Sequence, residues 1–162
     1  MTGGTPMTGG TPAAGGAARP KPAPVVTPET EPFWDAAQRE ELCIQRCNAC
    51  GRHYFYPRPF CPRCSSDDVA WVQVSGRATL HSYVINHRPF PGWEDDGPYA
   101  IAVVELEEGP RMATSIVGLP NTPEHLVLDM RLRVCFEEQG GMKIPKFRPE
   151  QAGPEQAGMG QS

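Results

Sequence analysis

Four cysteines in two closely spaced pairs constrain this chain more than any other feature. They stand in the segments CNACG, residues 47–51, and CPRC, residues 61–64, with ten residues between the pairs. Two such pairs on a short tether can place four sulfur atoms tetrahedrally around one metal ion, and zinc is the usual metal among four thiolates. The spacing therefore predicts a zinc ribbon with the ligands Cys47, Cys50, Cys61 and Cys64.

Disulfide bonding is the alternative for these cysteines. A bridge within one Cys-x-x-Cys pair has the geometry of redox motifs rather than of structural staples, so zinc and a reducing compartment are favoured. Four protein ligands leave no open position for water, so the metal is expected to be structural. Gly51 suits a tight knuckle because glycine tolerates positive φ. Cys43 could in principle compete as a ligand, but Cys43 and Cys135 are expected to be small buried apolar residues rather than reactive thiols.

The two ends of the chain are repetitive. MTGGTP occurs twice in the first 12 residues, and PEQAG occurs twice between residues 149 and 158. Such Gly- and Pro-rich segments cannot bury enough apolar surface to offset their ordering entropy, so residues 1–32 and 149–162 are predicted to be disordered tails. There is no apolar run of membrane-spanning length and no signal-peptide core, so a cytoplasmic location is expected.

The central part of the chain changes character near residue 69. Residues 33–68 are predicted to hold an N-terminal helix, starting near Pro32, and the ribbon. Residues 69–148 alternate with period two, which is typical of half-buried strands. The expected strands cover residues 69–75, 78–85, 99–106, 111–117, 131–137 and 143–147, with a sharp bend at Gly76 joining the first two into one long strand. This inventory predicts a mainly β protein whose second part is a five-stranded OB-fold barrel, with a small β-sandwich as the alternative.

Aromatic side chains are the candidate contacts to a partner. They are Phe33 and Trp34 in the helix, Tyr54 and Tyr56 between the cysteine pairs, and Phe90 and Trp93 in the loop over residues 86–93. Loops on a rigid barrel often carry recognition, so this loop and the ribbon are expected to face a partner. Packing within the chain is the alternative for the helix and ribbon aromatics.

The sequence argues against two classes of function. It has no nucleophile elbow, no phosphate-binding loop and no His-Glu metal helix, so stand-alone catalysis is not expected and no catalytic residue is assigned. The formal net charge of −4 disfavours extended binding of nucleic acid. Nucleic-acid binding stays an alternative because four arginines cluster in the ribbon, namely Arg46, Arg52, Arg58 and Arg63.

The order of motifs resembles the DUF35 family over nearly the whole part that is expected to fold. The resemblance is carried by QRCNACGRHYFYPRPFCPRC, SGRATLHSYVINHRPF, PYAIAVVELEEGPRMATSIVG, MRLRVCFEE and IPKFRP. It implies a rubredoxin-like zinc ribbon joined to an OB-fold. It also implies an accessory subunit in a hetero-oligomer, paired with a thiolase-fold acyl-CoA enzyme or with a MaoC-like enoyl-CoA hydratase.

The resemblance further implies that the OB-fold helps to hold a CoA thioester. Arg46, Arg52, Arg58 and Arg63 are the candidate contacts to its phosphates, because arginine clamps phosphate by charge-assisted hydrogen bonds; ordinary surface charge is the alternative. The expected function is a non-catalytic subunit of a thiolase-fold enzyme, in its most specific form one that cleaves a steroid side-chain CoA thioester by a retro-aldol reaction.

Overall fold

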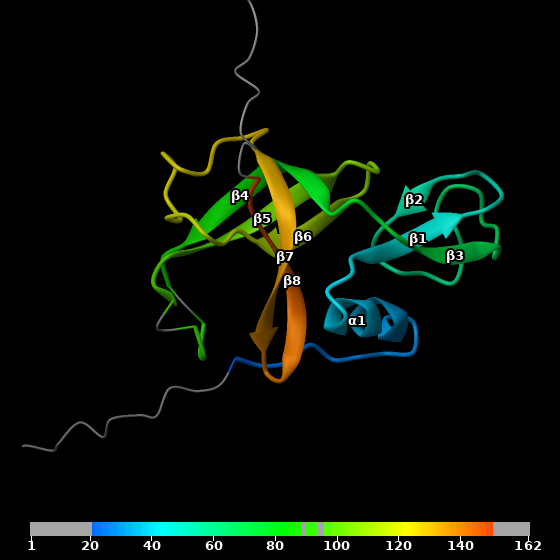
Figure 1. The fold of residues 1–162 in the computed structure, drawn as a ribbon, viewed down its shortest axis with the longest axis horizontal. Helices are drawn as coiled ribbons and strands as arrows, with labels where there is room; N and C mark the ends of the chain where they lie inside the picture. The colour runs from blue at the N-terminus through cyan, green and yellow to red at the C-terminus, as the bar shows by residue number, and fades with distance from the viewer. Residues whose placement is uncertain (1–20, 89, 94–95, 151–162) are drawn as a thin grey trace, which may run out of the picture.

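The computed structural model describes residues 21–88, 90–93 and 96–150 (Figure 1). The predicted disorder of residues 1–20 and 151–162 therefore lies outside the described residues. Residues 21–32 were predicted to belong to the disordered tail; the structure describes them, and Lys21 and Pro22 contact the side chains of Asp96 and Gln139, whereas Val25 and Val26 are exposed. Thr30 is buried, and its hydroxyl and backbone form hydrogen bonds with Thr27. Among the described residues, there is no helix whose length and apolar character would suit a membrane crossing.

The N-terminal helix predicted near Pro32 is present and spans eight residues. α1 (Glu31–Gln38) has a proline in its first turn and buries Phe33, Ala36 and Ala37. It ends in a Schellman motif, in which the N–H of Glu41 donates to the carbonyl of Ala36 and Glu40 takes a φ of 62°. This turn redirects the chain, so Leu42 enters the core from the segment that follows the helix.

The ribbon is a three-stranded antiparallel sheet. Its strands are β1 (Cys43–Cys47), β2 (His53–Tyr54) and β3 (Val69–Gln73), in the order β2-β1-β3. The expected single long strand through Gly76 is therefore wrong, because β3 pairs with β1 along its whole length and not with the barrel. The predicted bend at Gly76 is confirmed by its φ of 72°. Period two identifies a strand but carries no information on which sheet the strand joins.

The second sheet forms a nearly closed barrel. Its strands are β4 (Arg77–Asn86), β5 (Tyr99–Leu106), β6 (Arg111–Ser115), β7 (Arg131–Gln139) and β8 (Met142–Pro149), in the antiparallel order β6-β5-β4-β7-β8. The edge strands meet through a bridge between Ile116 and Phe147, and the N–H of Val117 donates to the carbonyl of Phe147 over 2.8 Å. The OB-fold prediction is confirmed over the sandwich.

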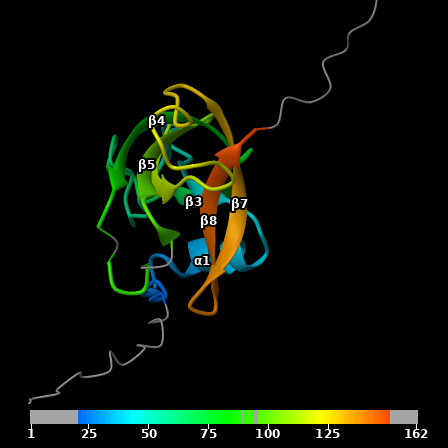
Figure 2. The ribbon, with the colours of Figure 1, turned by 90° about the vertical axis from the view of Figure 1, so that its left-hand side faces the viewer.

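Helix, ribbon and barrel share one core. The barrel contributes the fully buried side chains of Leu80, Leu132 and Phe147, and Phe33 and Ile44 join them from the helix and the ribbon. The ribbon lies beside the barrel, and α1 lies next to the β7–β8 hairpin in both views (Figures 1 and 2). This shared core fixes the loop between the cysteine pairs against the barrel wall.

Candidate functional site

The two cysteine pairs lie in equivalent turns. The N–H of Gly51 donates to the carbonyl of Cys47 over 2.8 Å, and the N–H of Ser65 donates to the carbonyl of Cys61 over 2.9 Å. Both donors have positive φ, 72° for Gly51 and 58° for Ser65. The predicted knuckle at Gly51 is thus confirmed. Its counterpart at Ser65 could not be found from the sequence, because no glycine marks it.

The four sulfur atoms are arranged for one metal ion. The Sγ atoms of the four predicted ligands all lie within 4.8 Å of one another. The Cys47–Cys64 pair is 3.6 Å apart and the Cys50–Cys61 pair 3.7 Å. A tetrahedron with Zn–S bonds of about 2.3 Å has S–S edges of about 3.8 Å, whereas a disulfide is about 2.0 Å long. The donor set therefore fits a structural zinc ion, whose binding would replace the thiol protons.

The electrostatics of the cluster suit a cation. Backbone N–H groups of Cys64 and Arg63 lower the pKa of the Cys61 thiol to about 6 against the effect of its burial. The N–H of Ser66 acts in the same direction on Cys64, but contacts with the neighbouring thiols outweigh it and raise the pKa of Cys64 to about 12. Without a metal the thiols share protons, and a dication would let all four ionise.

The two other cysteines lie outside this cluster. Cys43 is at the far end of β1, opposite Gln73, and is therefore not a competing ligand. The Sγ of Cys135 donates to the carbonyl of Lys146. Burial raises the pKa of both thiols. Both are half-buried and protonated near neutral pH, as expected for packing residues rather than reactive groups.

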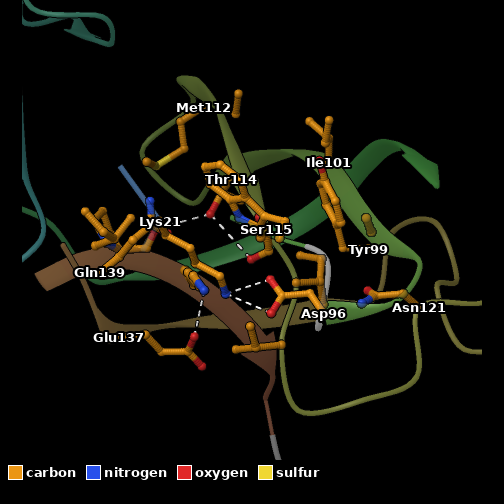
Figure 3. Close-up of a pocket in the computed structure, with 18 of the residues that line it drawn as sticks. Lys21, Asp96, Tyr99, Ile101, Met112, Thr114, Ser115, Asn121, Glu137 and Gln139 are labelled. Carbon is orange, nitrogen blue, oxygen red and sulfur yellow. Dashed lines mark hydrogen bonds and ion pairs between the residues drawn. The ribbon is translucent and has the colours of Figure 1, made fainter. Parts of the chain in front are cut away.

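A cavity of about 810 Å³ lies where the helix, the ribbon and the loop over residues 86–98 meet the seam between β6 and β8 (Figure 3). We call it the seam cavity. Its aromatic wall consists of Phe33, Trp34, Phe55, Tyr56, Phe90, Trp93 and Tyr99. Its aliphatic wall comes from the barrel, mainly Ile101, Met112, Ile116, Ile144 and Pro145. Segments far apart in the sequence thus share one concave surface.

The seam cavity gathers most of the aromatic residues that were predicted to contact a partner. Tyr56 and Phe90 are 58% and 59% exposed, and Trp93 is half-buried and lines the same cavity. Phe33 is 5% exposed and packs against Trp34 and Phe55 with ring centroids 4.9 and 5.5 Å away, so it contributes only an edge of the wall.

Tyr54 does not reach the seam cavity. It is 6% exposed, packs beside Cys47 and Cys61, and donates its hydroxyl to the carbonyl of Arg58. Packing within the chain, the alternative interpretation, holds for Tyr54 and for most of the surface of Phe33. Sequence reasoning missed Phe55, although it stands between two residues that were singled out.

Charged residues at the rim of the seam cavity are paired. Lys21 Nζ lies 2.6 Å from a carboxylate oxygen of Asp96, and Lys146 Nζ lies 2.7 Å from one of Glu137. The side-chain amide of Gln139 donates to the carbonyl of Pro22 over 2.9 Å. Residues 21–23, which we call the strap, therefore connect the β7–β8 hairpin to Asp96, and Lys21 lines the cavity.

The four ribbon arginines do not meet in one pocket. All four are exposed, and within the described residues none of their guanidinium groups forms an ion pair. None of them lines the seam cavity. Arg52 lines a separate open cleft of about 450 Å³, together with His53 and Arg111, between β2 and the β5–β6 turn. Their contact with CoA stays a prediction.

Models of two protein domains match the chain in succession. They describe the rubredoxin-like zinc ribbon domain of ChsH2, over residues 34–70, and the C-terminal OB-fold domain of ChsH2, over residues 71–137. Among solved structures, a chain of "Ltp2-ChsH2(DUF35) aldolase" is similar with a TM-score of 0.69 and 34% identity. That similarity covers 78% of this chain and 98% of the other.

Curated relatives agree with these matches. The chain is 37% identical over 102 residues to a DUF35 domain-containing scaffold protein of Methanothermobacter thermautotrophicus, covering 62% of this chain and 75% of that protein. It is 36% identical over 135 residues to a probable enoyl-CoA hydratase alpha subunit of Thermomonospora curvata, covering 82% of this chain but only 40% of the relative. It is 33% identical over 124 residues to the 3-oxo-4,17-pregnadiene-20-carboxyl-CoA hydratase alpha subunit of Mycobacterium tuberculosis, covering 76% of this chain and 38% of the relative. The succession of ribbon and barrel, the zinc-ligand cluster and these similarities together show that the chain belongs to the DUF35 family.

Proposed function

We propose that this protein is a non-catalytic subunit that docks onto an acyl-CoA enzyme through the aromatic rim of its seam cavity. The observation that carries the proposal is the exposure of Tyr56 and Phe90, more than half of each ring side chain, at the edge of one concave surface. Aromatic anchors of this kind are enriched at the centres of protein interfaces. Relatives described as a scaffold protein and as hydratase alpha subunits support a role within an assembly.

One pair of side chains resembles a nucleophile with its base but lies away from the seam cavity. Thr122 Oγ1 and His125 Nδ1 are 2.9 Å apart, a distance that would suit a nucleophile and its base. The two residues belong to a single exposed turn, in which the N–H groups of His125 and Leu126 donate to the carbonyl of Thr122. Neither Thr122 nor His125 lines the seam cavity. Their contact is a local cap, and the proposal assigns the chemistry to the partner.

A thiolase-fold enzyme is the partner that we favour, with retro-aldol cleavage of a steroid side-chain CoA thioester as the most specific form of its reaction. The likeness to a chain of "Ltp2-ChsH2(DUF35) aldolase", which extends over 98% of that chain, supports the aldol type of this reaction. A MaoC-like hydratase is the second candidate, because two relatives are described as hydratase alpha subunits. Those relatives are matched over less than half of their length, so the match does not distinguish their partners from others.

The arginines of the ribbon are the proposed contacts to the phosphates of CoA. Their exposed and unpaired guanidinium groups support this role, because phosphate needs cations that are not already neutralised. Arg52 is the residue to test first, since its unpaired guanidinium lines an open cleft, in which the neighbouring Arg111 is already paired with Glu105.

Affinity capture from the producing cells, followed by mass spectrometry, tests the docking proposal. A thiolase-fold enzyme should be recovered in near-equal amount with the native chain and lost with the double variant Tyr56→Ala, Phe90→Ala. Leu128→Ala is the matched control, because Leu128 is an equally exposed apolar residue, 55%, that does not line the seam cavity. Recovery of a hydratase instead would favour the second partner. Recovery of nucleic acid without an acyl-CoA enzyme would overturn the proposal.

A further inference from the structure

The seam cavity has the size and wall of a small-molecule site. Its volume of about 810 Å³ lies within the range of roughly 300–1,000 Å³ that is usual for ligand pockets. Aromatic rings from α1, the ribbon and the loop over residues 86–98 face aliphatic side chains of β5, β6 and β8 across it. Figure 3 shows Met112, Thr114 and Ser115 of β6 on one side and Glu137 and Gln139 of β7 on the other. A rigid barrel thus supplies most of the wall.

The seam between β6 and β8 brings residues of the barrel core to the wall of the cavity. Close to the cavity, the hydroxyl of Thr114 donates to the carbonyl of Pro145, and this contact replaces a continuous ladder between the two strands. Met112 and Ile116 belong both to the core and to the cavity wall. An apolar molecule in the cavity would therefore extend the hydrophobic core rather than lie on a polar surface.

The charges of the wall decide what kind of molecule fits. The described lining residues include two cations and two anions, and these form the ion pairs Lys21–Asp96 and Lys146–Glu137. Each cation is already neutralised, and the described wall contains no arginine. A pyrophosphate that left water for this cavity would find no free cation to replace its hydration, so the site disfavours the nucleotide part of CoA.

We infer that the seam cavity binds the uncharged, apolar acyl body of a thioester and leaves the nucleotide outside. The identification of the ligand as an acyl thioester rests on the proposed function. The binding of an uncharged apolar molecule rests only on the cavity. The protein would then recognise the acyl group of the thioester. Any contact to phosphate would come from the ribbon arginines, which lie outside the cavity.

The test uses the full zinc-loaded chain without a partner. The probe is the decanoyl thioester of N-acetylcysteamine, which is uncharged and lacks the nucleotide. Calorimetry should give saturable one-to-one binding in the micromolar range, and the fluorescence of Trp34 and Trp93 in the wall should change. Millimolar free CoA should not displace the probe. Absence of saturable binding, or competition by free CoA, would overturn the inference.

Matched variants locate the binding. Ser115→Phe places a ring in the cavity and should weaken probe binding at least about tenfold. Ser82→Phe makes the same change on an exposed position of β4 outside the cavity and should leave binding within about twofold of the native chain. Circular dichroism and zinc content confirm that each variant folds. Should Ser115→Phe fail to fold, Trp93→Ala is the second variant. It removes part of the wall that the loop contributes and should weaken probe binding severalfold. Unchanged probe binding in a folded Ser115→Phe or Trp93→Ala variant would overturn the assignment.

The outcomes separate the inference from the proposed function. Probe binding by the isolated chain together with failure to capture an acyl-CoA enzyme would overturn only the docking proposal. Capture of a thiolase-fold enzyme by a chain that does not bind the probe would overturn only the ligand assignment.

Discussion

Gly76 lies in the short connection between β3 of the ribbon and β4 of the barrel, and its backbone conformation determines how the two parts pack together. It follows the last strand of the ribbon sheet, takes a φ of 72° and accepts a hydrogen bond from the N–H of Val134 over 2.8 Å. A Cβ atom added there would lie 2.5 Å from Cγ1 of Val134. Only glycine allows both the left-handed backbone and the close approach of β7 at this point.

Gly76→Ala should therefore destabilise the protein by about 2–4 kcal/mol, from backbone strain and from overlap with Val134. The free energy of unfolding from urea titration measures the change. Gly97→Ala is the control, because Gly97 has a φ of 63° but no atom within 4 Å of the added Cβ. It should cost about 1 kcal/mol from strain alone. Equal costs for both variants would contradict the steric account.

The metal ligands can be tested one residue at a time. Cys61 is 2% exposed and lies in the sulfur cluster, so Cys61→Ser should abolish stoichiometric zinc binding and disorder the ribbon. Cys135→Ser should keep one zinc ion per chain, because Cys135 lies on β7 outside the cluster. Elemental analysis of the purified proteins measures the zinc content. A native zinc content in Cys61→Ser would refute the ligand assignment.

At the scale of the elements, the strap connects segments that are far apart in the sequence at the rim of the seam cavity. Lys21 reaches a carboxylate 75 positions away, and Pro22 accepts a hydrogen bond from a side chain 117 positions away. Gly140, in the β7–β8 turn, lets the strap pass, since a Cβ added there would lie 2.8 Å from the backbone nitrogen of Ala23. The β7–β8 turn and the strap are therefore in close backbone contact, which the absence of a side chain at Gly140 allows.

Gly140→Ala should push the strap away from the hairpin. Cleavage after Val25 or Val26 by an elastase-type protease should become severalfold faster, because proteolysis follows the population of the open segment. Gly141→Ala is the neighbouring control, since nothing lies within 4 Å of its added Cβ. Equal cleavage rates in the two variants would show that the strap does not depend on Gly140.

Some of these elements can be predicted from the sequence, and others cannot. The zinc ligands follow from spacing, and the barrel strands follow from alternation because each strand has one buried face. The pairing of β3 with β1 was out of reach, because alternation reports the faces of a strand and not its neighbour. The strap was missed because it follows a Gly- and Pro-rich segment that predicts disorder. Its contacts with Asp96 and Gln139 join residues far apart in the sequence, which composition cannot indicate. Tyr54 was misplaced because its exposure depends on the fold of the ribbon around the sulfur cluster.

At the scale of the whole molecule, ribbon and barrel share one hydrophobic core. Phe33, Leu42 and Ile44 belong to the same core as Leu80 and Phe147 of the barrel. A change in the ribbon is therefore transmitted to the barrel through direct packing rather than through a flexible linker.

Removal of zinc by a strong chelator should accordingly affect more than the ribbon. The midpoint of thermal unfolding should fall by about 10 °C or more, since the metal binds only the folded ribbon, and it should recover when zinc is returned. Circular dichroism during heating measures it. The zinc-free chain should also lose affinity for the decanoyl probe, because Phe55 and Tyr56 of the cavity wall stand between the two cysteine pairs. If a chain shown to be free of zinc unfolded at the same midpoint, loss of zinc from the ribbon would not destabilise the barrel through the shared core.

The placement of Phe55 and Tyr56 between the zinc ligands has a thermodynamic consequence. If the metal shapes the wall against which a ligand packs, the two binding equilibria are linked, and each must strengthen the other by the same factor. A chain with its cavity filled would then give up zinc less readily than an empty one. In such a chain, loss of the metal would promote release of the ligand, and loss of the ligand would promote release of the metal.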